Sequence, residues 1–324
     1  MGDRMAQKKL GLVVSAPDSA AVLRSIAELE QQGIPAAWLT SAGAGGADPL
    51  GVLAGAALQT QHIMLGTAIT QTFPRHPIAV VQQALVLAQL AAGRFRLGLG
   101  TSGRAGMEQT FGVNFRAPLG HLREYLRIVK ALLQEGTVDF SGRYYQGHSR
   151  ISAPVDMPVM AAALGEKAYE LCGAEADGAI SWVCPGSYLR DVALPALQRG
   201  ADSASRPVPP LIAHAPVCVH EHADTVRAAI RQQFGFFAST PFYQNMFRAA
   251  GFPEVTQGAW SDAMIDAVTL YGDESQVADA IEGLFRLGAT EILVSLVAVG
   301  EDPAASRART LRLLSQLSQS DTHS

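Results

Sequence analysis

The residues whose types suggest ligand chemistry stand at the ends of two apolar, strand-like runs. One run covers residues 65–70, and the other covers residues 95–100 and continues into Thr101 and Ser102. Glycine lets a backbone approach a bound molecule closely, and hydroxyl groups can donate hydrogen bonds to a ring or a phosphate. We therefore expect Gly100, Thr101 and Ser102 to contact a ligand. A plain turn is the alternative.

The spacing Gly98-x-Gly100-x-x-Gly103 also matches the dinucleotide-binding fingerprint. That fingerprint normally occupies the first βα turn and opens directly into a helix. Here it follows the fourth strand-like run and enters a loop, and no acidic residue ends a strand about twenty residues later. The pattern therefore argues against a Rossmann site.

A second candidate lies at residues 163–167, where Gly165 joins a strand-like run to a helix. Glycine at a helix start leaves backbone amides open to an anion, and the helix dipole and Lys167 favour negative charge there. The Glu166 carboxylate can satisfy the same amides. An ordinary capped turn thus remains the alternative to a phosphate site.

The histidines give weaker signals. His76 precedes Pro77 at a helix start and is a candidate for contact with a cofactor or substrate. His220 and His222 form an H-x-H pair that could chelate a metal, but we expect a solvated loop and no metal there. The chain contains no G-x-S-x-G elbow, Walker loop or H-E-x-x-H motif, which leaves hydrolase functions without support.

Composition narrows the class of protein further. The 324 residues are 48% hydrophobic and 17% charged, with a net charge of −4. Without a basic cluster, nucleic acid and anionic membranes are not expected partners, and no apolar run is long enough to span a bilayer. Cys172, Cys184 and Cys218 form no C-x-x-C pair and are interpreted as packing residues of a reduced, cytoplasmic protein.

Strand-like runs alternate with amphipathic helices along the whole chain. Eight such units predict a single α/β domain over residues 1–324, a TIM (β/α)8 barrel. The expected strands cover residues 10–14, 36–39, 65–70, 95–100, 159–163, 179–183, 211–219 and 291–297.

Two insertions interrupt this alternation, one after the fourth strand and one after the seventh. The first is expected to contain a helix over residues 121–133 and a hairpin over residues 138–145 that turns at Ser141 and Gly142. The second, residues 220–271, is helical and rich in aromatic side chains between Phe234 and Phe247. These aromatics either line a pocket or pack the helices together.

Several of these segments together resemble the luciferase-like monooxygenase superfamily. The resemblance covers most of residues 10–182, and the second half agrees in the order of elements more than in motifs. The segments are Leu65-Gly-Thr-Ala-Ile, Arg75-His-Pro, Gly93-Arg, Leu97-Gly-Leu-Gly, Phe140-Ser-Gly-Arg-Tyr-Tyr, Pro158-Val-Met-Ala-Ala-Ala-Leu-Gly and Ala176-Asp-Gly.

This resemblance implies a barrel that binds FMN or the deazaflavin coenzyme F420 at the carboxyl ends of its strands. Residues 163–167 are similar to the deazaflavin-using branch, in which this turn holds the cofactor phosphate. It also implies a non-prolyl cis peptide at Ala68–Ile69 behind the ring. The expected cofactor-binding residues are Thr67, Ala68, Ile69, Gly100, Thr101, Ser102, Ala163, Leu164, Gly165, Glu166 and Trp182.

The chain departs from the family at the end of the second strand, where relatives carry a histidine or an acid near the ring. Here the sequence is Leu39-Thr40-Ser41, so the usual proton donor is absent. The remaining candidates are Thr40, Ser41, His76, Glu108 or a water molecule.

The expected function is hydride transfer between F420 and an unidentified small organic substrate. One alternative is an FMN-dependent monooxygenase that uses molecular oxygen, and another is a catalytically silent barrel that binds a ligand. A homodimer is the default expectation for a soluble oligomer.

Overall fold

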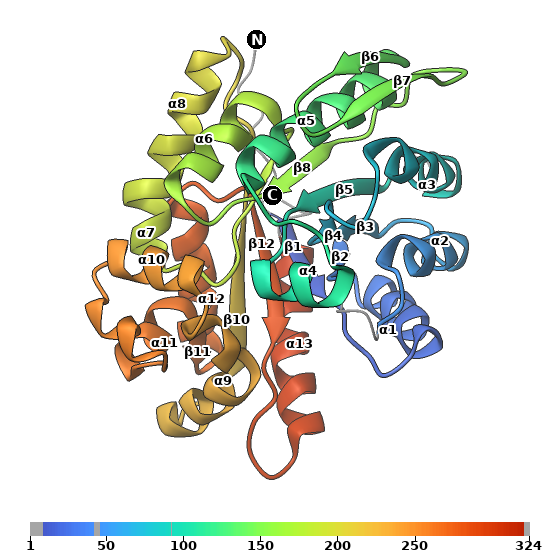
Figure 1. Cartoon of the computed structure of the whole chain (residues 1–324). Coiled ribbons are helices and arrows are strands. Elements are labelled where there is room, and N and C mark those ends of the chain that lie inside the picture. The colour runs from blue at the N-terminus through green and yellow to red at the C-terminus, as the bar shows by residue number, and fades with distance from the viewer. Residues whose placement is uncertain (1–8, 42–45, 92, 321–324) are drawn as a thin grey trace.

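The computed structural model describes residues 9–41, 46–91 and 93–320, and it confirms the predicted barrel (Figure 1). Strands that pair in parallel close on themselves, because β10 pairs with β12 on one side and with β9 on the other. In barrel order the strands are β1 (Lys9–Val13), β2 (Ala36–Leu39), β3 (Met64–Thr67), β5 (Phe95–Gly100), β8 (Val159–Ala162), β9 (Ala179–Ile180), β10 (Leu211–Val219) and β12 (Glu291–Leu296).

Helices surround the barrel, and several of them begin at capping side chains. Asp48 accepts hydrogen bonds from the amides of Leu50 (3.1 Å) and Gly51 (3.2 Å), with Pro49 in the first helical turn. The outer helices are α1 (Ser19–Gln31), α2 (Pro49–Gln59), α3 (Pro77–Ala91), α6 (Glu166–Glu175), α7 (Gly186–Tyr188), α8 (Leu194–Ser203), α12 (Glu274–Arg286) and α13 (Pro303–Ser320).

The sixth outer helix is divided into two parts. A π-helical segment, η2 (Leu189–Ala193), separates α7 from α8, and α8 continues to Ser203.

The first insertion contains α4 (Arg104–Phe111), α5 (Pro118–Lys130), the π segment η1 (Ala131–Glu135), and the hairpin of β6 (Thr137–Ser141) and β7 (Gln146–Arg150). The predicted hairpin range of 138–145 was wrong, because residues 142–145 form the turn and the second strand follows them.

The physical reason for this shift lies on α5. The Glu124 carboxylate accepts hydrogen bonds from the amides of Arg143 (2.9 Å), Tyr144 (2.8 Å) and Tyr145 (3.0 Å). These amides are therefore not available to a β ladder.

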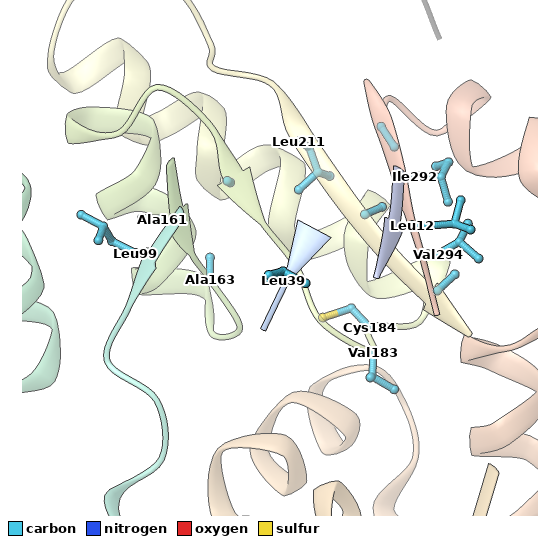
Figure 2. Packing of buried hydrophobic residues seen from close by; sticks show 14 of the residues in the cluster. Leu12, Leu39, Leu99, Ala161, Ala163, Val183, Cys184, Leu211, Ile292 and Val294 are labelled. Atoms are coloured by element: carbon cyan, nitrogen blue, oxygen red, sulfur yellow. The ribbon is translucent and has the colours of Figure 1, made fainter. Parts of the chain in front are cut away.

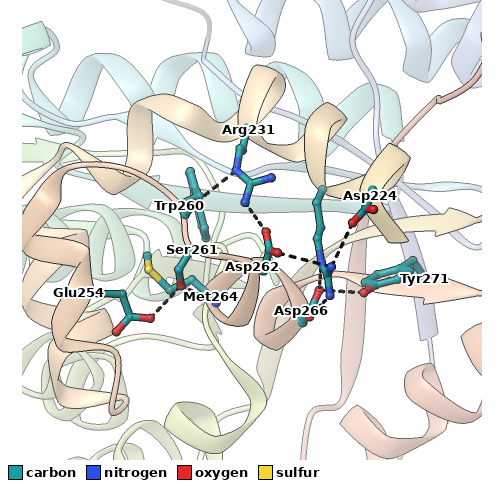
Figure 3. A network of polar contacts seen from close by, with 10 residues as sticks. Asp224, Arg231, Glu254, Trp260, Ser261, Asp262, Met264, Asp266 and Tyr271 are labelled. Carbon is teal, nitrogen blue, oxygen red and sulfur yellow. Dashed lines mark hydrogen bonds and ion pairs between the residues drawn. The ribbon is translucent and has the colours of Figure 1, made fainter. Parts of the chain in front are cut away.

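The second insertion contains α9 (Ala223–Ala238), α10 (Pro241–Ala249), the 3-10 turn η3 (Pro253–Gln257), α11 (Asp262–Val268) and the short strand β11 (Leu270–Gly272), which pairs with β10. Figure 3 shows how polar contacts join α9 to α11. Arg227 pairs with Asp266 at 2.6 Å, and Arg231 pairs with Asp262. The indole N–H of Trp260 donates to the Phe234 carbonyl (2.9 Å). Ion pairs and a hydrogen bond thus hold α9 against the segment that contains α11.

The main hydrophobic core lies between the strands and the surrounding helices, and Figure 2 shows part of it around Leu12, Leu99 and Ile292. All three cysteines are buried, as predicted. Burial raises the pKa of the Cys172 and Cys184 thiols to about 12, so both remain protonated and pack as small apolar groups. No helix among the described residues has the length and apolar character needed to cross a bilayer.

An ion pair and an indole lie together in the barrel interior near the amino ends of the strands. Arg96 Nη1 lies 2.5 Å from Glu291 Oε2, and Nη2 donates to Oε1 at 3.1 Å. The indole N–H of Trp38 donates to the same carboxylate (2.8 Å), and the guanidinium stacks 4.4 Å from the indole centroid. All three side chains are buried.

Glycines make room for this indole. A Cβ at Gly11 would lie 2.6 Å from Trp38 Nε1, and a Cβ at Gly66 would lie 2.5 Å from Trp38 Cε3. The neighbouring strands β1 and β3 therefore need glycine at these positions.

We predict that Glu291→Gln destabilises the fold by about 3–5 kcal/mol, because it leaves the buried Arg96 guanidinium without a counter-charge. Urea unfolding followed by circular dichroism measures the change. The double variant Arg96→Met, Glu291→Met removes both charges and should lose less stability than the single variant. A single variant within 1 kcal/mol of wild type would contradict the predicted role of the ion pair.

Candidate functional site

A bulge ends β3 toward the carboxyl ends of the barrel strands, just beyond the residue that pairs with Arg96. Gly66 pairs with Arg96, and pairing resumes between Thr70 of β4 (Thr70–Gln71) and Leu99. Three residues separate Gly66 from Thr70, whereas only two separate Arg96 from Leu99, so one extra residue is accommodated here. The peptide between Ala68 and Ile69 within this bulge is cis, as the family resemblance implied.

Gly98 and Ser41 hold the bulge in place. A Cβ on Gly98 would lie only 1.9 Å from the Thr67 carbonyl oxygen, so glycine is required there. The Thr67 hydroxyl is buried and bonded to both the carbonyl (2.8 Å) and the amide (2.9 Å) of Gly98. Ser41 Oγ donates to the Ile69 carbonyl at 2.7 Å. The Ser41 proton is therefore engaged with the backbone.

A cavity of about 720 Å³ opens at the carboxyl ends of β2, β3, β5, β8 and β9. It brings together most of the residues that the sequence predicted for the site, although they come from distant parts of the chain. These lining residues are Thr40, Ser41, Ala68, Ile69, Thr101, Ser102, Ala163, Leu164, Gly165, Glu166 and Trp182.

Two predicted cofactor residues lie behind the cavity wall. Thr67 is occupied with Gly98, as described above. The Ile69 side chain occupies the space that a side chain at position 100 would need, since a Cβ on Gly100 would lie 2.8 Å from Ile69 Cγ1. Both residues thus shape the bulge that the cavity exposes.

Two of the proton-donor candidates lie elsewhere. His76 is exposed, and its Nε2 lies 3.0 Å from the Gln146 carbonyl in the hairpin. Glu108 pairs with Arg104 (2.8 Å) on α4. Neither residue lines the cavity, whereas Thr40 and Ser41 do.

The amino terminus of α6 forms one end of the cavity. Its N-cap, Gly165, makes no capping bond, and a Cβ on Gly165 would meet no atom within 4 Å. The Glu166 carboxylate turns to Arg199 (2.5 Å), so it does not cap the helix. First-turn amides beside Lys167 are therefore open to an anion, and this end fits the phosphate of a bound cofactor.

Trp182 forms another wall, and a buried histidine supports it. The indole stacks on the His214 ring with centroids 3.7 Å apart and planes 12° apart. His214 Nδ1 accepts from the Val183 amide (3.2 Å), so Nε2 carries the proton and donates to Ser295 Oγ (2.8 Å). Burial lowers the pKa of His214 to about 3, which keeps the ring neutral at physiological pH.

Sequence reasoning missed His214. The available signal is a lone histidine in the otherwise apolar run Leu211–Val219, all of which is buried. Because every residue of this strand is buried, the sequence shows no alternation of apolar and polar residues that would reveal which side chains face the barrel interior.

The aromatic residues of the second insertion divide into two groups. Phe234 and Phe247 are buried among the helices, which confirms the packing alternative for these two. Phe236, Phe237, Phe242 and Tyr243 line the cavity, which supports the pocket alternative for them.

We predict that His214→Gln reduces the acid sensitivity of folding. Below its ordinary pKa of about 6.5 the unfolded chain binds a proton at this histidine, but the folded chain does so only near pH 3. Stability therefore falls on acidification, and this residue accounts for about 2 kcal/mol of the loss between pH 7 and pH 5.

Urea unfolding at the two pH values measures this loss. The stability difference should shrink by about 2 kcal/mol in His214→Gln, whereas His76→Gln, at an exposed histidine, should leave it unchanged. Equal pH dependence in wild type and His214→Gln would show that His214 titrates normally in the folded protein.

Comparison with known proteins agrees with this architecture. The family model described as luciferase-like monooxygenase matches residues 5–291. An F420-dependent glucose-6-phosphate dehydrogenase of Kineococcus radiotolerans is 36% identical over 160 residues, which are 46% of this chain and 47% of that protein.

Two solved structures share the fold. An F420-dependent secondary alcohol dehydrogenase in complex with an F420-acetone adduct superposes with a TM-score of 0.79 at 18% identity, covering 94% of this chain and 97% of that one. The oxygenating constituent of 3,6-diketocamphane monooxygenase from Pseudomonas putida, in complex with FMN, superposes with a TM-score of 0.68 at 16% identity, covering 97% and 98%. Since the family model matches most of its length, the chain belongs to the luciferase-like monooxygenase family.

Proposed function

We propose that this protein is an oxidoreductase that transfers hydride between coenzyme F420 and a small organic substrate. The observation that carries the proposal is that one cavity joins the Ala68–Ile69 bulge to the open amino terminus of α6. A flat ring and a phosphate on one molecule would fit these two features. The F420-dependent relative at 36% identity supports the deazaflavin over FMN.

Particular residues would hold the coenzyme. Ala68 and Ile69 would support the ring, and the first-turn amides at Gly165 and Glu166, with Lys167, would hold the phosphate. When bound in its reduced form, F420 supplies a hydride, which is two electrons with one hydrogen nucleus.

The chain itself would contribute orientation and exclusion of water. Leu119 and Leu122 of α5 and Trp182 give the cavity apolar walls, and the neutral His214 ring holds Trp182 in its plane. Apolar walls remove water from the path of a hydride, and a fixed ring position lowers the entropic cost of alignment.

Titration of the purified protein with oxidised F420 and with FMN, followed by the fluorescence of each cofactor, tests the choice of coenzyme. We expect saturable binding of F420 with an affinity at least about tenfold higher than that for FMN. Preferential binding of FMN would overturn the proposal and favour an FMN-dependent monooxygenase. Binding of neither cofactor would favour a ligand-binding barrel without this chemistry.

The variant Gly165→Asp tests the phosphate end of the cavity. Its carboxylate would cap the α6 amides, so we expect unchanged or slightly higher stability together with an affinity for F420 lower by about tenfold or more. Gly283→Asp on α12 is the matched control, because Gly283 does not line the cavity and a Cβ there would meet Arg286 Nη2 at 3.9 Å, an ordinary contact distance. Equal affinity for F420 in both variants would show that the phosphate does not bind at the amino terminus of α6.

A further inference from the structure

Tyr243 carries a hydroxyl group whose hydrogen-bonding capacity is unused within the protein. It lies in the first turn of α10, lines the cavity, and packs on Phe237 with ring centroids 4.7 Å apart. Among the described residues none forms a hydrogen bond with its hydroxyl, and the hydroxyl oxygen retains accessible surface, unlike the sealed hydroxyl of Tyr125. Because Tyr243 lines the cavity, its hydroxyl could donate a hydrogen bond to a molecule bound there.

The tyrosines nearby are engaged within the protein. The Tyr188 hydroxyl donates to the Leu164 carbonyl (3.0 Å), and the Tyr169 hydroxyl contacts the Cys184 thiol (3.8 Å). Burial, with a smaller contribution from Cys184, raises the pKa of Tyr243 well above its usual value of 10. Its hydroxyl is therefore protonated at neutral pH and available as a donor.

Charge is distributed unevenly along the cavity. The charged residues that line it are Glu166 and Lys167, both at the α6 end, and Glu166 is paired with Arg199. The other lining residues are uncharged, and most are apolar, among them Leu119, Leu122 and the phenylalanines of the second insertion. With Lys167 assigned to the coenzyme phosphate, an anionic substrate in this cavity would lose its hydration without gaining a counter-charge.

The mouth of the cavity exposes apolar surface. Phe236 is 72% exposed and Phe242 is 47% exposed, and both line the cavity. The turn between them is fixed, because Ser239 Oγ and Thr240 Oγ1 both donate to the Phe236 carbonyl at 2.9 and 3.0 Å. A fixed, exposed pair of phenylalanine rings at a cavity entrance is suited to an apolar ligand.

From this arrangement we infer that the substrate is an uncharged, largely apolar ketone or the corresponding secondary alcohol, and that Tyr243 is the catalytic residue that hydrogen-bonds its oxygen. This inference rests on the proposed function for its chemistry. It assigns the proton donor to a residue outside the set that the sequence suggested.

In the reducing direction, a hydride from the reduced deazaflavin forms a C–H bond at the carbonyl carbon as the C=O π bond breaks. The Tyr243 hydroxyl proton forms the O–H bond, so the ketone gains two electrons and two hydrogens. The tyrosinate regains its proton from water when the alcohol leaves. An alkoxide is more basic than a phenolate, so this proton transfer is favourable in spite of the raised pKa of Tyr243.

Ligand binding without cofactor tests the inference independently of F420. Two apolar ketones, acetophenone and 2-octanone, are the main probes. Ethylbenzene has the carbon skeleton of acetophenone without its oxygen, and glucose 6-phosphate serves as the anionic probe. Isothermal titration calorimetry compares wild type, Tyr243→Phe and the control Tyr144→Phe, whose hydroxyl lies outside the cavity lining.

We expect wild type and Tyr144→Phe to bind both ketones and to show no binding of glucose 6-phosphate. Tyr243→Phe should bind the ketones about five- to tenfold more weakly and ethylbenzene equally well, since only the hydrogen bond is lost. Equal ketone affinity in Tyr243→Phe would overturn the role of Tyr243. Failure of both ketones to bind, or binding of glucose 6-phosphate, would overturn the substrate class.

Turnover of F420-loaded enzyme provides a second readout. Tyr243→Phe should lower kcat about a hundredfold or more, with a smaller change in KM, as loss of a proton donor predicts. Ketone binding that depends on Tyr243, in a protein that does not bind F420, would refute the proposed coenzyme while leaving the ligand class and the hydrogen bond intact.

Discussion

The ion pair between Arg96 and Glu291, covered by Trp38, is the interaction on which the rest of the barrel depends. A buried carboxylate and guanidinium lose the stabilisation of water and are tolerable only when each finds close partners. Here the guanidinium contacts both carboxylate oxygens and stacks on the indole, which itself donates to the carboxylate. These contacts link β2, β5 and β12 across the interior and fill the amino end of the barrel. The described cavity opens at the opposite, carboxyl end of the strands.

A continuous series of contacts leads from this group to the site. Trp38 requires glycine at position 66, which is the last residue of β3 that pairs with β5 before the bulge. The bulge in turn requires glycine at position 98, because the Thr67 carbonyl occupies the space of a side chain there. Ser41, from the end of β2, then binds the Ile69 carbonyl. The glycines that first suggested a ligand thus act by positioning the bulge.

The sequence predicted most of the architecture because its signals are local. Asp48 and Pro49 mark a helix start by their own chemistry, and the eight strand-like runs are separated by helices with clear periodicity. Most of the predicted cofactor residues line one cavity, since the carboxyl ends of barrel strands necessarily meet at one face.

What the sequence could not predict depends on contacts between distant residues. The hairpin turn is set by Glu124, about twenty positions earlier, and its strands therefore differ from the local pattern. His214 and Tyr243 belong to a buried strand and an aromatic helix, where a residue facing the cavity and a residue in the core look alike. Only the folded arrangement separates Tyr243 from Phe247, four positions later, which is buried.

The cavity combines open helix amides and Lys167 at α6 with a lining that is otherwise uncharged and mostly apolar and that includes Tyr243. A crystal structure of the protein with F420 tests the placement of the coenzyme in this cavity most directly. We expect the phosphate at the amino terminus of α6, the ring against Ala68 and Ile69, and free space between the ring and Tyr243. A phosphate bound elsewhere, or a ring that fills the space in front of Tyr243, would contradict this placement.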